Sequence, residues 1–101
     1  MRMLIEARMP HQEFNDAVVD GSAGEKLGRI FDSLKPEAVY FAETYGQRTA
    51  FVIVNLDDPA QIPAVAEPFF LLFSADVELH PCMTLEDLKR AGLEELGQKW
   101  G

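Results

Sequence analysis

Alternating apolar and polar positions predict four β-strands in this chain. Each predicted strand is followed at once by Pro, Gly or Asp, residues that favour turns. The four segments are residues 2–9, 38–45, 48–56 and 75–80. Gly46 and Gln47 separate the middle two segments, so they predict a β-hairpin with a two-residue turn of type II′.

Apolar residues recur at helical spacing between the strands. A helix interrupted near residues 20–24, where Gly and Ser cluster, is predicted between the first two strands. Asp58 and Pro59 predict the start of a second helix, which two further prolines should kink or split. Beyond the last strand, Thr84 and Asp87 have the spacing of a capping box, which predicts a helical tail.

The order of the elements is β-α-β-β-α-β, followed by that tail. It predicts one α+β domain over residues 1–101, a ferredoxin-like four-stranded antiparallel sheet with both helices on one face. The uncovered face of such a sheet should be polar. The third strand departs from this pattern, since Val52 and Val54 fall on one side and Phe51 and Ile53 on the other. A second copy of the chain, packed sheet against sheet, would cover the extra apolar side, so we expect a homodimer.

Charge and composition narrow the classes of partner. Lys and Arg number 9 against 17 Asp and Glu, a net charge of −8, whereas nucleic acids and anionic membranes bind cationic surfaces. The longest apolar run, residues 69–73, is too short to span a bilayer. The single Cys82 cannot form an intrachain disulfide, which is typical of a reducing cytoplasm. We therefore expect a cytoplasmic protein with neither nucleic acid nor membrane as a partner.

Two histidines are the candidates for proton transfer. His80 shares a strand side with Asp76 and Glu78, so a carboxylate two residues away could orient it as a general base. His11 follows the corner at Pro10, and loops at strand ends often carry functional groups. His80 could equally be a polar residue on the outer face of an edge strand, since charged residues commonly protect such edges. His11 could equally be a solvated residue in the first turn of the helix. The two histidines lack the spacing of a metal site, and no residue requires a metal or an organic cofactor.

Glu6, Arg8 and Tyr40 are the candidates for binding a ligand. The first strand is central in the predicted sheet, so its charged residues should be buried and need partners. Glu6 and Arg8 could form a structural ion pair, or Arg8 could bind a substrate carboxylate through two hydrogen bonds. Tyr40 could orient a small molecule through its hydroxyl, or it could be a packed aromatic residue.

The element order, the run Asn55-Leu56-Asp57-Asp58-Pro59 and the closing strand at 76–81 resemble the dimeric α+β barrel superfamily. That superfamily includes muconolactone isomerases, cofactor-free monooxygenases and a small bacterial branch without an assigned activity, which the pattern resembles most. The resemblance covers residues 1 to about 83 and rests on pattern, without a catalytic signature. It implies two sheets paired in a barrel, with a ligand cleft between each sheet and its helices.

These observations are compatible with a binding protein, an enzyme or a structural oligomer. One hypothesis is a homodimeric barrel that binds a small, aromatic molecule in the sheet–helix cleft. The alternative for that cleft is a cofactor-free isomerase, lyase or monooxygenase, with Arg8 binding an anionic group and His80 or His11 moving a proton. The other class is a homo-oligomer without chemistry, in which the tail with Trp100 clasps the partner.

Overall fold

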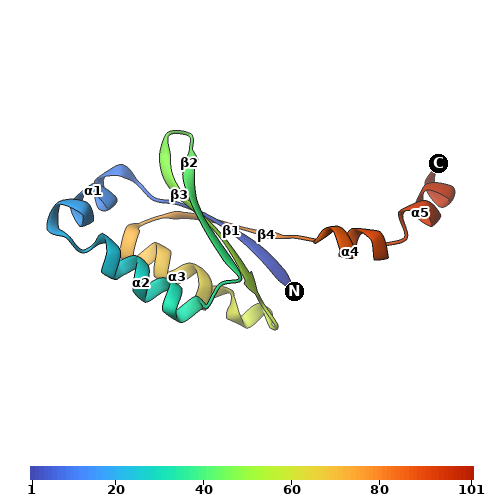
Figure 1. Ribbon diagram of the computed structural model, residues 1–101, viewed down its shortest axis with the longest axis horizontal. Helices are drawn as coiled ribbons and strands as arrows, with labels where there is room; N and C mark the ends of the chain where they lie inside the picture. Colours follow the sequence, from blue (N-terminus) through green and yellow to red (C-terminus); the bar gives the residue numbers. More distant parts are fainter.

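The computed structural model describes residues 1–101 as a sheet with helices on one face and an extended tail (Figure 1). The strands are β1 (Arg2–Arg8), β2 (Ala38–Thr44), β3 (Gln47–Asn55) and β4 (Asp76–Pro81). The helices are α1 (His11–Asp20), α2 (Ala23–Leu34), α3 (Ile62–Phe73), α4 (Leu85–Arg90) and α5 (Leu93–Trp100), with a short 3-10 helix, η1 (Pro59–Gln61), before α3. None of these helices is long and apolar enough to cross a membrane.

All four predicted strands are present, and they form one antiparallel sheet in the order β2-β3-β1-β4. This order fits a ferredoxin-like arrangement loosely. The strand β1 is central, as predicted, because it pairs with β3 on one side and with β4 on the other. The sheet is open, so β2 and β4 are its two edges.

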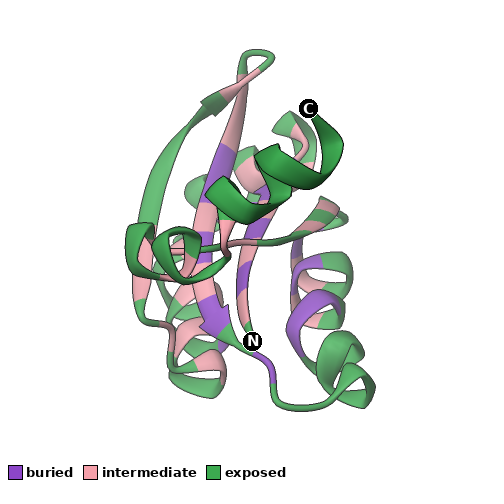
Figure 2. Ribbon diagram, turned by 90° about the vertical axis from the view of Figure 1, so that its right-hand side faces the viewer, coloured by how far each residue is buried: buried purple, intermediate pink, exposed green.

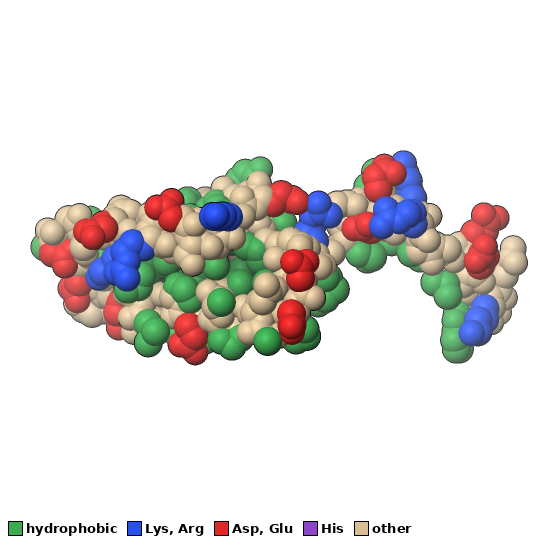
Figure 3. All heavy atoms as spheres, turned by 90° about the horizontal axis from the view of Figure 1, so that it is seen from below, with side chains coloured by type: hydrophobic (Ala, Val, Ile, Leu, Met, Phe, Trp, Pro, Cys, Tyr) green, Lys and Arg blue, Asp and Glu red, His purple; other side chains and the backbone are tan.

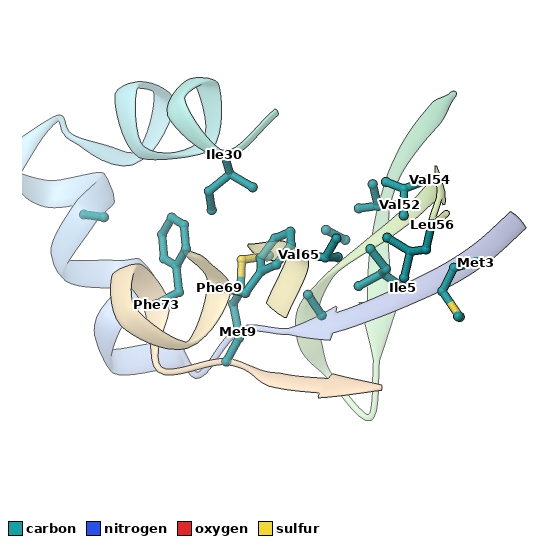
Figure 4. Close-up of a cluster of buried hydrophobic side chains, with 14 residues drawn as sticks. Met3, Ile5, Met9, Ile30, Val52, Val54, Leu56, Val65, Phe69 and Phe73 are labelled. Atoms are coloured by element: carbon teal, nitrogen blue, oxygen red, sulfur yellow. The ribbon is translucent and has the colours of Figure 1, made fainter. Parts of the chain in front are cut away.

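One face of the sheet and the helices α2 and α3 enclose the hydrophobic core (Figure 4). The residues of β1 and β3 that point toward the helices are Met3, Ile5, Ala7, Ala50, Val52 and Val54, all of them buried. Phe69 and Phe73 of α3 and Ile30 of α2 pack against them. The apolar side predicted for β4 also points this way, since Val77 and Leu79 pair with Ala7 and Ile5.

The hairpin between β2 and β3 has a different turn from the one predicted. Thr44 pairs with Gln47, so the two turn residues are Tyr45 and Gly46 rather than Gly46 and Gln47. Both have positive φ, 53° at Tyr45 and 76° at Gly46, which is the backbone of a type I′ turn. The prediction was wrong because Tyr rarely adopts this conformation, so the sequence did not mark it as a turn residue.

We expect opposite effects from two substitutions in this turn. Gly46→Ala should lower the free energy of unfolding by about 1 kcal/mol, because a Cβ is strained at positive φ. Tyr45→Asn should raise the free energy of unfolding, because Asn tolerates positive φ better than Tyr does. The Tyr45 side chain is 93% exposed, so its removal loses no packing contacts. Urea unfolding of both variants measures the effects; equal stabilities would contradict a type I′ turn.

The helices are interrupted where the sequence predicted. The first helical stretch is divided into α1 and α2 at Gly21. This glycine has a positive φ of 82°, and its N–H caps the end of α1. The proline-rich segment is split into η1 and α3, as predicted, and Pro68 lies inside α3. Asp58 begins η1 with a capping box in which its side chain accepts a hydrogen bond from Ala60 N–H at 2.9 Å.

Residues 83–101, hereafter the arm, extend away from the rest of the chain (Figures 1 and 3). The predicted capping box at Thr84 and Asp87 begins α4, and Gly92, with φ at 75°, separates α4 from α5. The radius of gyration is 16.7 Å, whereas a compact domain of about 100 residues has one of about 13 Å. The arm is therefore the part of the chain that makes its shape elongated.

Candidate functional site

The face of the sheet opposite α2 and α3, hereafter the open face, carries four of the five candidate residues. Alternate residues of each strand point toward it, and cross-strand pairing sets them in rows. One row runs Tyr40, Phe51, Glu6, Glu78, and the next runs Ala38, Ile53, Leu4, His80. Figure 2 shows how exposure varies over the sheet, with β2 mostly green and buried segments on β1 and β3.

Arg8 is at the centre of a charged cluster on β1 and β4. Its Nη1 donates hydrogen bonds to Glu6 and to Glu78 Oε2, the latter at 3.1 Å. The side chains of Arg8 and Glu6 are each only 18% exposed, and that of Glu78 is 49% exposed. The hydrogen bond from Arg8 lowers the pKa of the Glu78 carboxyl below its ordinary value. The predicted pairing of Glu6 with Arg8 is therefore present, and Glu78 is a second partner.

The cluster carries more negative than positive charge. Asp76, the β4 residue opposite Arg8, adds a third carboxylate near one guanidinium. An anionic ligand would meet these carboxylates as well as Arg8, which disfavours its binding. The Nε and Nη2 groups of Arg8 donate to no group of the chain, so they remain able to bind the oxygen of a ligand.

His80 lies at the edge of the same face, beside Glu78. Its Nε2 is 3.7 Å from Glu78 Oε2, and its side chain is 51% exposed. Tyr40, on β2, is at the opposite edge of the sheet and is 69% exposed. Three strand spacings, roughly 14 Å, separate these two edges. Within one chain, Tyr40 and His80 therefore do not belong to the same cluster of side chains.

Apolar side chains on β2, β3 and the start of β1 occupy one part of the open face. Phe51, Ile53 and Leu4 are half-buried there, although no helix covers them. Together with Tyr40 they form an apolar surface beside the Arg8 cluster. Aromatic rings of this kind offer flat surfaces on which another aromatic molecule can stack.

His11 is separate from these residues. It is exposed at the start of α1, after the Pro10 corner as predicted, and no hydrogen bond or ion pair links it to the open face. The structure does not bring the two histidines into a common cluster. No group of three or more His, Cys, Asp or Glu side chains is arranged to hold a metal ion.

The core fills the centre of the space between the sheet and its helices. Ile5, Val52 and Phe69 are fully buried there, and none of the five candidate residues lines any of the pockets. A pocket of about 420 Å³ lies between the helices and the hairpin end of the sheet, where Phe14 of α1 and Leu27 of α2 line it opposite Arg48 of β3. A ligand of Arg8 or Tyr40 would therefore lie on the open face, not in the sheet–helix cleft that the resemblance implied.

Sequence reasoning missed the contact between Glu78 and Arg8, because it treated Glu78 only as a partner of His80. A signal was present in the predicted topology. In a ferredoxin-like sheet the last strand pairs with the first, so polar residues of 76–80 had to lie beside those of β1.

Fold and site together define an α+β protein with a four-stranded antiparallel open sheet and helices after the last strand. No protein-family model matches the chain, and no curated protein matches it. Among solved structures it is similar to "De novo designed protein Ferredog-Diesel", at 12% sequence identity. That similarity covers 80% of this chain and 85% of the design, with a TM-score of 0.48, and says nothing about function.

Proposed function

We propose that this protein is a homodimer with ferredoxin-like subunits, in which two open faces pack into an α+β barrel and enclose a site for a small, uncharged aromatic molecule. The observation that carries the proposal is the composition of the open face. Half-buried apolar residues such as Phe51 and Ile53 lie there without a helix to cover them. A monomer rarely leaves such a surface in contact with water unless something binds to it.

The charged cluster favours an uncharged ligand over an anion. Arg8 is already hydrogen-bonded to two carboxylates, and Asp76 lies opposite it in the sheet. Its remaining N–H groups suit the carbonyl or hydroxyl oxygen of a neutral molecule. Phe51 and Tyr40 would then contact the aromatic ring of that molecule.

Binding is favoured over catalysis because the groups that could move a proton are dispersed. His80 and Tyr40 lie at opposite edges of the sheet, and His11 lies on α1. A general acid or base must come within hydrogen-bond distance of the reacting atom. A catalytic barrel would therefore need the second copy to bring a further group to the ligand.

Native mass spectrometry of gently purified protein tests the proposal directly. We expect the mass of two chains, with any additional mass identifying a bound molecule. A mass of one chain at all concentrations would overturn the paired sheets.

The ligand class can be tested with two para-substituted toluenes, one neutral and one anionic. We expect p-cresol to shift the amide NMR signals of β2 and β3 at lower concentration than p-toluate does, because p-toluate carries a carboxylate. Tighter binding of p-toluate would show that Arg8 acts as an anion site. If neither molecule bound, the proposed aromatic site would be wrong.

Substitution of Ile53 by lysine should separate the two copies. Ile53 points away from the core, so a single chain tolerates lysine there, whereas a paired sheet would have to bury the new charge in both copies. We expect the dimer to weaken roughly 100-fold or more, measured by light scattering coupled to size-exclusion chromatography. Val19→Lys is the matched control, since Val19 is 88% exposed on α1; equal weakening by both variants would contradict the open-face interface.

A further inference from the structure

We propose that the arm packs onto a second copy of the chain, where the apolar side of α5 covers the β2 edge of the open face and Trp100 forms a wall of the ligand site. This inference rests on the proposed homodimer. It adds a residue from the partner copy to the site, and it explains why the arm leaves its own domain.

The arm has an apolar side that nothing in its own chain covers. Leu93, Leu96 and Trp100 are three and four residues apart, so they share one side of α5. They are 57%, 45% and 76% exposed. Leu85 of α4 is 66% exposed as well, and Figure 3 shows apolar side chains on both helices, away from the body.

The two helices are too short to be stable without packing. The helix α4 has 6 residues and α5 has 8, whereas isolated helices shorter than about 12 residues are marginal in water. A surface that covers Leu93, Leu96 and Trp100 would supply the missing packing.

Contacts at the start of the arm direct it away from its own sheet. The Thr84 hydroxyl accepts a hydrogen bond from Asp87 N–H at 3.1 Å, and the Asp87 carboxylate accepts one from Thr84 N–H at 3.0 Å. The same carboxylate lies 4.0 Å from Arg2 Nη1 of β1. These contacts hold α4 at the end of β4, pointing outward (Figure 1). The apolar side of α5 is therefore placed to meet another chain rather than its own open face.

The β2 edge has the chemistry that this apolar side requires. On β2, which pairs only with β3, Tyr40 is 69% exposed on the open face. Phe41 points to the helix side, where its ring packs edge-to-face against Phe31, and it is still 58% exposed. The strand contains neither Lys nor Pro, which commonly protect a sheet edge from further pairing, and its one charged residue, Glu43, lies at the hairpin end. Proteins also protect such edges by covering them with a helix, and α5 of a second copy would do so.

One two-fold arrangement of the proposed dimer places the strand that carries the arm beside this edge. The arm begins at β4, and β2 is the opposite edge of the sheet. When two sheets pack face to face about a two-fold axis along the strands, β4 of each copy lies beside β2 of the other. Both arms then make the same contact. Covering Tyr40, Trp100 and the arm leucines in both copies would bury on the order of 1,000 Å², about what a specific interface needs.

Trp100 is the only tryptophan in the chain, so its fluorescence reports on the arm directly. We expect a blue-shifted emission in the dimer and several-fold weaker quenching by acrylamide than after dilution into monomers. Tyr40→Asp or Leu96→Asp should each restore strong quenching. Gln98→Asp is the matched control, since it introduces the same charge into α5 outside the apolar side, and circular dichroism confirms that each variant is folded.

A mixture of two variants tests whether the contact is between chains. One variant carries Tyr40→Asp and keeps Trp100; the other carries Leu96→Asp with Trp100→Ala and keeps Tyr40. After joint dilution and reconcentration, the arm of the first should dock on the second, and acrylamide quenching should weaken again.

Three results would overturn the inference: strong quenching in the wild-type dimer, protection of Trp100 that persists in monomers, or no protection in the mixture. A dimer with accessible Trp100 would refute only the role of the arm. A monomer at all concentrations by light scattering would refute the proposed homodimer itself.

Discussion

Replacement of Phe69 by alanine should lower the free energy of unfolding by about 3–5 kcal/mol, the usual cost of deleting a buried aromatic ring. Phe69 is 0% exposed in the centre of α3, and its ring packs edge-to-face against Phe31 with centroids 6.3 Å apart. A domain of this size is stable by only about 5–15 kcal/mol in total. The variant should therefore unfold at a much lower guanidinium concentration than the wild type, which a titration followed by circular dichroism would show.

Phe70→Ala is the matched control for this prediction. Phe70 is the next residue of α3, but it is 41% exposed and points away from the buried cluster. Its loss removes the same atoms with much less burial, so the free energy of unfolding should fall by a smaller amount. Equal losses for the two variants would contradict the position of Phe69 in the core.

Replacement of Arg8 by methionine should lower the melting temperature by several degrees. The methionine fills a similar volume, but Glu6 and Glu78 lose the guanidinium that both of them contact. Glu6, 18% exposed, is then a carboxylate with little access to water and no cation beside it. Arg2→Met is the control, because its closer partner Glu37 is 56% exposed and can be solvated, and its second partner Asp87, at 4.0 Å, keeps its hydrogen bonds within α4.

A second substitution separates a structural role of Arg8 from a ligand-binding role. If Arg8 stabilises the fold through its carboxylate partners, Glu6→Gln should recover part of the stability lost in Arg8→Met. An Arg8→Met protein as stable as the wild type would show that the ion pairs contribute nothing and would leave ligand binding as the role of Arg8.

The ion pair between Arg8 and Glu78 should also affect how the free energy of unfolding depends on pH. The pKa of Glu78 is lowered in the folded chain, mainly by its hydrogen bond from Arg8. Its stabilising contribution is therefore present above the ordinary glutamate range and is lost as the pH falls through the lowered folded-state pKa. We expect the acid side of the stability profile to flatten in Arg8→Met.

Much of the local structure could be predicted from the sequence because it depends on neighbouring residues. The polar side of β4 followed from the alternation of Asp76, Glu78 and His80, and the start of α4 followed from Thr84 and Asp87. The turn at Tyr45 and Gly46 could not be predicted in this way. A tyrosine adopts positive φ there because pairing along β2 and β3 determines which two residues close the hairpin.

The sequence indicated which residues belong to the candidate site, but not how far apart they lie. Glu6 and Arg8 alternate on one strand, so their common side was evident from the sequence. Their distance from His80 and Tyr40 depends on which strands are neighbours, and Glu78, the second partner of Arg8, is 70 residues away along the chain.

By itself, then, the sequence determined the strands, the helices and the side of each element on which a residue lies. These properties follow from periodicities of two and 3.6 residues, which a short segment expresses without the rest of the chain. Only the tertiary structure decided which face of the sheet the helices cover and that the arm extends away from it. Both depend on contacts between distant segments, such as Arg2 with Asp87 and Ile5 with Leu79, that no local pattern specifies.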